Sequence, residues 1–158
     1  DVYKRQGYTQ YEISAYAQVE RQCRHNLNYW QFGDYLGIGA GAHDKITDMA
    51  QQTITRCWKE KHPDAYLSNA ATEQRIAGSR TLSQDDTILE FMLNALRLTH
   101  GFNNDLFQQH TGLSLKSIEA AMQKAESKGW LIRNNGCIQP TEEGQRFHND
   151  LVTLFLPA

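Results

Sequence analysis

The chain has 158 residues, of which 40% are hydrophobic and 22% are charged, and its formal net charge is -2 at pH 7. This composition is typical of a folded globular protein and argues against wholesale disorder. The near-neutral charge gives no broad electrostatic footprint for nucleic acid or for an anionic membrane surface. There is no apolar run of about 18 residues and no signal-peptide pattern, so we expect a cytoplasmic protein without an integral membrane segment.

The first residues and the cysteines limit the possibilities further. Residues 1–6 show no apolar period that continues into the next segment, and we interpret them as a non-native addition. The three cysteines, Cys23, Cys57 and Cys137, are odd in number and widely spaced. Neither a disulfide framework nor a zinc site is indicated, and a reducing compartment fits.

The first third of the chain predicts strands. Residues 8–16 alternate apolar and polar side chains, and an apolar stretch at 35–38 predicts a second strand. Between them, residues 23–34 form an aromatic cluster that is too short for a long helix. This order of strand, connection and strand predicts an α/β unit.

Glycines at positions 37, 39 and 41 follow the second predicted strand. Without side chains they let a ligand approach the backbone closely, although their spacing does not match a dinucleotide-binding fingerprint. Two hypotheses stay open, a cofactor-binding loop and a barrel strand that tolerates glycine.

The remainder predicts a polar connecting arm and then a helical domain. Residues 44–84 are polar and mixed, with a short helix from Pro63. From Asp85 the pattern is helical. The expected elements are a helix ending near Gly101, a helix over 105–110 ending at Gly112, a helix from Ser114 to Gly129, a hairpin over 130–139 turning at Asn134-Asn135-Gly136, and a last helix from Thr141 that buries Phe147, Leu151, Leu154 and Phe155. This order predicts a winged helix.

A winged helix raises the hypothesis of a DNA-binding regulator. The charge of residues 86–158 argues against it, with 6 basic and 8 acidic residues where phosphate binding needs a basic face. On the third helix, the lysines alternate with Glu119 and Glu126, which is typical of a solvated face. We therefore expect no nucleic-acid partner.

The densest chemical cluster lies at residues 23–30, which place a thiol, an imidazole and two aromatic rings within eight positions. Imidazole is a good axial ligand for haem iron, thiolate is an alternative, and aromatic rings suit a porphyrin face. The other hypothesis is that the aromatic rings pack in the core and that His25 is a hydrogen-bonded surface group.

Three segments, GYTQYEISAYA, HNLNYW and FGDYLGIGAGAH, resemble the oxygen-independent coproporphyrinogen III oxidase-like family of radical SAM proteins. Within that family, HNLNYW is similar to the HNxxYW motif of the haem-chaperone (HemW) branch. The resemblance runs from about Gly7 to the end and implies the C-terminal part of a family member. It implies the last strands of an incomplete radical-SAM (β/α) barrel over 1–48, a connecting arm over 49–84 and a winged-helix-like domain over 85–158.

The resemblance also implies cofactors. A full-length family member binds a [4Fe-4S] cluster through a CxxxCxxC motif, with S-adenosylmethionine on the cluster, and this sequence has no such motif. We therefore assign no cluster ligand and no catalytic residue, and we do not expect the chain to be catalytic alone. The implied haem-binding positions are His25, Asn26, Tyr29 and Trp30, with His25 as the candidate iron ligand, and the implied S-adenosylmethionine edge is Gly39, Gly41 and Ala42.

The function implied by the resemblance is that of a haem chaperone, which binds haem and delivers it to client proteins that require it. The alternative is a coproporphyrinogen III oxidase of porphyrin biosynthesis, and a DNA-binding regulator is the third hypothesis. Whether the protein forms a homodimer stays open. Because barrel strands without neighbours expose hydrogen-bonding edges, we expect the first 45 or so residues to be less stable alone than the C-terminal domain.

Overall fold

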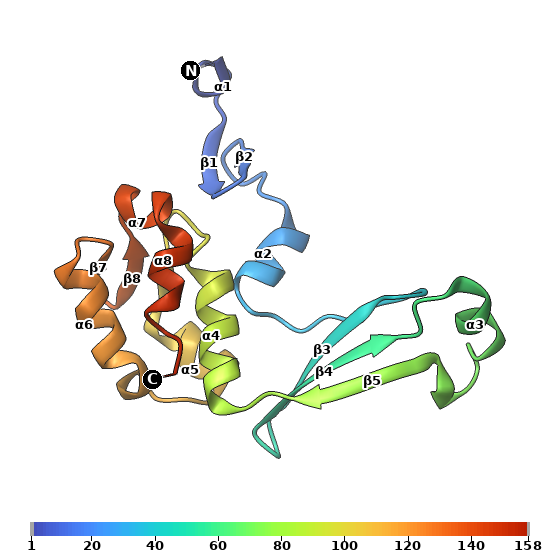
Figure 1. Ribbon diagram of the computed structural model, residues 1–158. Helices are drawn as coiled ribbons and strands as arrows, with labels where there is room; N and C mark the ends of the chain where they lie inside the picture. The colour runs from blue at the N-terminus through green and yellow to red at the C-terminus, as the bar shows by residue number, and fades with distance from the viewer. Residues whose placement is uncertain (1, 158) are drawn as a thin grey trace. The chain divides into compact units, whose positions relative to one another are not determined.

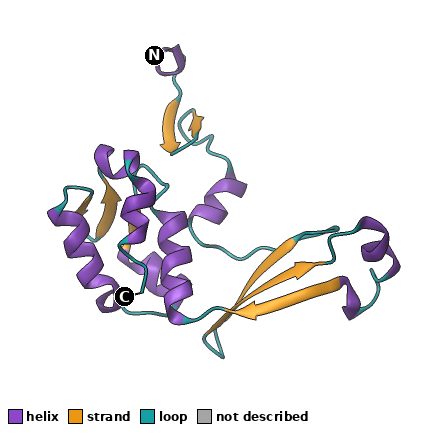
Figure 2. Ribbon diagram, viewed as in Figure 1, coloured by secondary structure: helices purple, strands orange, loops and turns teal. Residues whose placement is uncertain are grey.

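The computed structural model describes residues 2–157, which divide into two compact units (Figure 1). One unit combines the first 32 residues with the chain from Ile88 onward, and the other is formed by Gly33–Thr87. Helices and strands occur in both units (Figure 2). The division predicted from the family, at residues 48 and 84, stays a prediction.

The unit of residues 33–87 contains an antiparallel sheet of three strands in the order β3-β4-β5. Its elements are β3 His43–Asp48, β4 Thr53–Lys59, α3 Pro63–Ser68, the 3-10 helix η1 Glu73–Arg75 and β5 Ile76–Thr81. The helix at Pro63 is confirmed, whereas the sheet was not expected from so polar a segment. Two lysines of the strands form ion pairs within this unit. Lys45, which is only 1% exposed, pairs with Asp34 at 2.9 Å, and Lys59 pairs with Asp44 at 2.6 Å.

The strand predicted over residues 35–38 is wrong. Only Tyr35 forms a β-bridge, to Lys45, and the chain runs as a loop until β3. Gly37 lies so close to β3 that an added Cβ would stand 2.3 Å from the carbonyl oxygen of His43. The strand pairs among residues 2–157 are antiparallel, so the unit of strand, connection and strand predicted over residues 8–38 is not seen among them.

The segment 8–16, predicted as one strand, forms a hairpin of two strands, β1 Thr9–Glu12 and β2 Ala15–Ala17. A one-turn helix, α1 Val2–Arg5, precedes it. Beyond the hairpin comes α2 Arg24–Trp30. The hairpin is fixed to the segment after helix α4 by backbone hydrogen bonds, from Ile13 N to Arg97 O at 3.2 Å and from Thr99 N to Tyr11 O at 3.1 Å.

The predicted order of helix, helix, helix, hairpin and helix is confirmed in a mixed α/β arrangement. The elements are α4 Gln84–Ala95, β6 Phe102–Asn103, α5 Asn104–Thr111, the 3-10 helix η2 Leu115–Ile118, α6 Glu119–Ser127, β7 Leu131–Asn134, β8 Cys137–Pro140, α7 Glu142–Arg146 and α8 His148–Thr153. The hairpin turn has positive φ at both Asn135 and Gly136, which matches the right-handed twist of its strands. The short strand β6 completes the sheet in the order β6-β8-β7.

Two details of the helices differ from the prediction. Helix α4 ends at Ala95 rather than near Gly101. The backbone of Gly101 instead lies so close to strand β8 that an added Cβ would stand 2.0 Å from the carbonyl oxygen of Ile138. The last helix is broken at Phe147 into α7 and α8, and the side chain of Phe147, predicted to be buried, is 47% exposed.

Phe91 of α4 lies at the centre of the core and is fully buried. Its ring makes edge-to-face contacts with Phe32, Phe102 and Phe107, at centroid distances of 5.7, 5.0 and 5.1 Å. Phe32 is only 1% exposed, so the segment that follows α2 belongs to the same core as the C-terminal helices.

Candidate functional site

Helix α2, which carries the HNxxYW residues, is held by tertiary contacts more than by its own sequence. It has seven residues, no side chain caps its N-terminus at Cys23, and no acidic residue lies in its first turn. An isolated helix of this length is marginal in water. Its orientation therefore depends on what it packs against.

One face of α2 presents an imidazole to solvent. His25 is exposed, and the half-buried Tyr29, one turn further on, meets it edge to face with ring centroids 4.8 Å apart. Positions i and i+4 share a helix face, so the two rings form a contiguous aromatic pair. An accessible imidazole can bind a metal ion without any rearrangement of the backbone.

The neighbouring face of α2 is turned toward the protein. Asn26 Nδ2 donates a hydrogen bond to Tyr11 Oη at 3.4 Å, and the guanidinium carbon of Arg97 lies 4.2 Å from the centroid of the Trp30 ring. This distance is well within the range of a cation–π contact. The Trp30 indole nitrogen is buried and has no hydrogen-bond partner among the described residues.

Arg97 is itself held by a buried carboxylate. Its Nη2 atom lies 2.9 Å from Oε2 of Glu12, which is 1% exposed, and the other Glu12 oxygen accepts from Ser14 Oγ at 2.7 Å. Glu12 therefore faces the interior of the protein. Its buried position comes from the pairing of β1 with residues 97–99, which no local pattern reveals.

A second buried polar group beside this pair, His148 on α8, was not anticipated. The ring is 9% exposed, and no hydrogen bond of normal geometry reaches either ring nitrogen from the described residues. Burial lowers the pKa of His148 and the charge of Arg97 lowers it further, while the backbone of Leu93 and Leu96 acts in the opposite direction. Burial and the nearby guanidinium of Arg97 thus both favour the neutral form of the ring.

The glycine-rich residues belong to the unit of residues 33–87. Gly39, Gly41 and Ala42 lie in the loop before β3, where Gly39 N donates to Tyr66 Oη and Gly41 N donates to Glu60 O. Gly39 and Gly41 have φ values of +109° and +69°, which already favour glycine. An added Cβ at Gly39 would meet nothing within 4 Å, so the backbone is open to approach from that side.

The cysteines show no metal centre. Cys23 is exposed, Cys57 and Cys137 are half-buried, and all three are free thiols. Within residues 2–157, no group of three or more histidine, cysteine, aspartate or glutamate side chains is arranged to hold a metal ion.

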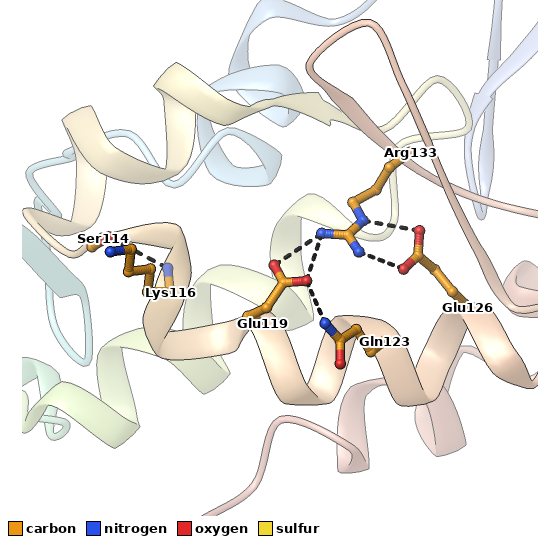
Figure 3. A network of polar contacts seen from close by, with 6 residues as sticks. All are labelled: Ser114, Lys116, Glu119, Gln123, Glu126 and Arg133. Carbon is orange, nitrogen blue, oxygen red and sulfur yellow. Dashed lines mark hydrogen bonds and ion pairs between the residues drawn. The ribbon is translucent and has the colours of Figure 1, made fainter.

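Helix α6 and the β7–β8 hairpin are joined by a charged network (Figure 3). Arg133 donates to both carboxylate oxygens of Glu126, at 2.9 and 2.6 Å, and to Glu119, whose pKa is lowered by hydrogen bonds from Arg133 and Gln123. At the start of the same segment, Ser114 accepts from Lys116 N. The only arginine of the hairpin is thus engaged by two acidic residues of α6.

Comparisons of sequence and of fold relate this chain to HemN proteins. Residues 82–147 match the family model of the HemN C-terminal domain. The fold of 98% of the chain matches 38% of a solved structure, that of coproporphyrinogen III oxidase (HemN) from Escherichia coli, a radical SAM enzyme, with a TM-score of 0.64. At 16% identity this likeness shows a shared fold. No described helix has the length and apolarity needed to cross a membrane.

Relatives with higher sequence identity are haem chaperones. The chain is 41% identical over 150 residues to heme chaperone HemW of Haemophilus influenzae and 40% identical over 150 residues to heme chaperone HemW of Escherichia coli. Each alignment covers 95% of this chain and 38% of the relative, so the chain spans about two fifths of these proteins. The chain is homologous to the HemW haem chaperones and is related to HemN.

Proposed function

We propose that the protein to which this chain belongs is a haem chaperone, which binds haem and passes it to client proteins. Homology at about 40% identity to proteins named haem chaperones supports the class. The observation that carries the site is the exposed imidazole of His25, paired with Tyr29 on the outer face of α2. We propose a ring nitrogen of His25 as the ligand of the haem iron, with Asn26, Tyr29 and Trp30 completing the haem-binding motif.

The residues present fit haem better than they fit an iron–sulfur cluster. A neutral imidazole is a common axial ligand of haem, and Tyr29 offers an aromatic surface beside it. Bound haem would supply the iron that His25 ligates. We propose no cluster site on this chain, and the [4Fe-4S] cluster is left to the family's CxxxCxxC motif in a full-length protein.

We propose Gly39, Gly41 and Ala42 as an edge of the S-adenosylmethionine site in a full-length protein. The support is the open space beside Gly39, where a side chain would otherwise stand. We propose that residues 85–158 are winged-helix-like, which the order of helices and hairpin supports. We propose that residues 1–48 are the last part of a radical-SAM barrel in a full-length protein, which the likeness to the fold of HemN supports.

A coproporphyrinogen III oxidase is the second candidate, favoured by the likeness to HemN. We rank a DNA-binding regulator below both, because residues 86–158 carry more acidic than basic residues and the arginine of the hairpin, Arg133, is already paired with Glu119 and Glu126.

The experiment that separates the first two candidates uses a full-length protein containing this chain, with its cluster assembled. A chaperone is expected to transfer haem to an apo haem protein, to lose that transfer in His25→Ala, and to leave coproporphyrinogen III unchanged. Oxidation of coproporphyrinogen III with no haem transfer would instead establish the oxidase.

A further inference from the structure

The four HNxxYW residues do not share one face of α2. His25 and Tyr29 form one pair at i and i+4, and Asn26 and Trp30 form another, displaced by one residue around the helix. The first pair contains the exposed ring, whereas the second pair contacts Tyr11 and Arg97.

We infer that the motif divides between two tasks: His25 and Tyr29 receive haem, whereas Asn26 and Trp30 position the helix, with Arg97 as a positioning residue for the iron ligand. The inference rests on the proposed haem function and assigns a role to Arg97 and Glu12, which lie outside the motif.

Trp30 is poorly placed to stack on a porphyrin. The Arg97 guanidinium covers one face of its ring at 4.2 Å, and its indole nitrogen is buried. One face of the half-buried Trp30 ring is thus taken up by a contact within the protein. Tyr29, which touches His25, is the aromatic residue that can accompany bound haem.

Arg97 connects α2 to the β1–β2 hairpin by three kinds of contact. Its side chain stacks on Trp30, its Nη2 pairs with Glu12 at 2.9 Å, and its backbone carbonyl accepts from Ile13 N at 3.2 Å. Because no side chain caps the N-terminus of α2, these contacts set the direction in which His25 points. A ligand must be held to within about 0.5 Å and 10–20° of its productive geometry.

The test is a haem titration followed by absorbance on this chain and on Arg97→Gln, Trp30→Leu and the double variant. Loss of a residue that supports a metal ligand costs about 10- to 100-fold in affinity. We expect Arg97→Gln to weaken binding at least tenfold while the Soret maximum stays in place, because the ligand is still His25. Arg97→Lys should restore part of the affinity, since an ammonium group can pair with Glu12 and lie over the indole ring.

The effects of the Arg97 and Trp30 substitutions on haem affinity distinguish a positioning role from a general loss of stability, because only a shared role makes them non-additive. If Arg97 acts through Trp30, the double variant should bind haem as weakly as Trp30→Leu alone. The control is Arg133→Gln, which breaks a similar arginine–carboxylate network with no contact to α2. Far-ultraviolet circular dichroism at the titration temperature verifies folding, and if Arg97→Gln does not fold, Arg97→Lys and Trp30→Leu carry the comparison.

Equal haem affinities of Arg97→Gln and Arg133→Gln, or additive losses in the double variant, would overturn the inference. A displaced Soret band in Trp30→Leu would also overturn it, because Trp30 would then contact haem directly. A His25→Ala variant measured in parallel separates the two proposals: if it binds haem like wild type, the proposed haem site itself has failed.

Discussion

Glu12 is a buried carboxylate that pairs with Arg97, and Arg97 in turn lies over the ring of Trp30 in α2. It is 1% exposed and accepts hydrogen bonds from Arg97 and Ser14. Removing one partner of a buried pair leaves the other charge uncompensated, and because Arg97 is partly exposed we expect Glu12→Gln to cost about 2–3 kcal/mol. Urea denaturation measures the loss, with the exposed Glu142→Gln as control. Equal stabilities of the two variants would show that the pair contributes nothing.

The neutral ring of His148 predicts a pH dependence of stability. Burial and then the charge of Arg97 lower its pKa in the folded state, so the unfolded state takes up a proton first as the pH falls below about 6.5. The free energy of unfolding should therefore decrease from that pH down to the lowered pKa and be fully retained above it. Denaturation of wild type and His148→Leu between pH 8 and 5, values that bracket roughly the ordinary histidine range, measures this. The same slope in both proteins would contradict the prediction.

At the scale of elements, α2 is stabilised by the residue that follows it. Phe32 is 1% exposed and packs edge to face on Phe91, although it lies outside the helix. Truncating a fully buried phenylalanine costs about 3–5 kcal/mol. We expect Phe32→Ala to lose that much in thermal or chemical unfolding, whereas Phe147→Ala, at a side chain that is 47% exposed, should lose much less. A small effect at Phe32 would mean that α2 is not part of the core.

The elements that could be predicted from the sequence are those with local signals. Asn103 and Ser114 cap the starts of their helices, Gly112 ends one at φ +71°, and Asn135-Gly136 turns the hairpin. The β3-β4-β5 sheet carried no such signal, because the aspartates that neutralise its lysines are not adjacent to them in sequence. For Asp34, burial alone would raise the pKa, but hydrogen bonds from Lys45 and Thr47 outweigh it and lower the pKa.

The sequence predicted the motif residues of the candidate site but not the residues that hold them. The HNxxYW residues could be recognised by resemblance and placed on one short element. The face of Asn26 and Trp30 is held by contacts that involve Arg97 and, through it, Glu12, and these two residues are 85 positions apart in the chain. The family resemblance therefore made His25 the candidate haem ligand, which stays a prediction, but did not indicate which residues hold the helix that carries it.

The proposed function of the whole molecule depends on haem that is bound through His25. The most direct test is an absorbance titration of this chain with haem, alongside His25→Ala and, as a control, His100→Ala, another exposed histidine of the same unit. We expect tight binding with a Soret band typical of histidine-ligated haem in wild type and His100→Ala, and a lost or shifted band in His25→Ala. Identical spectra and affinities in all three proteins, or binding by none of them, would contradict it.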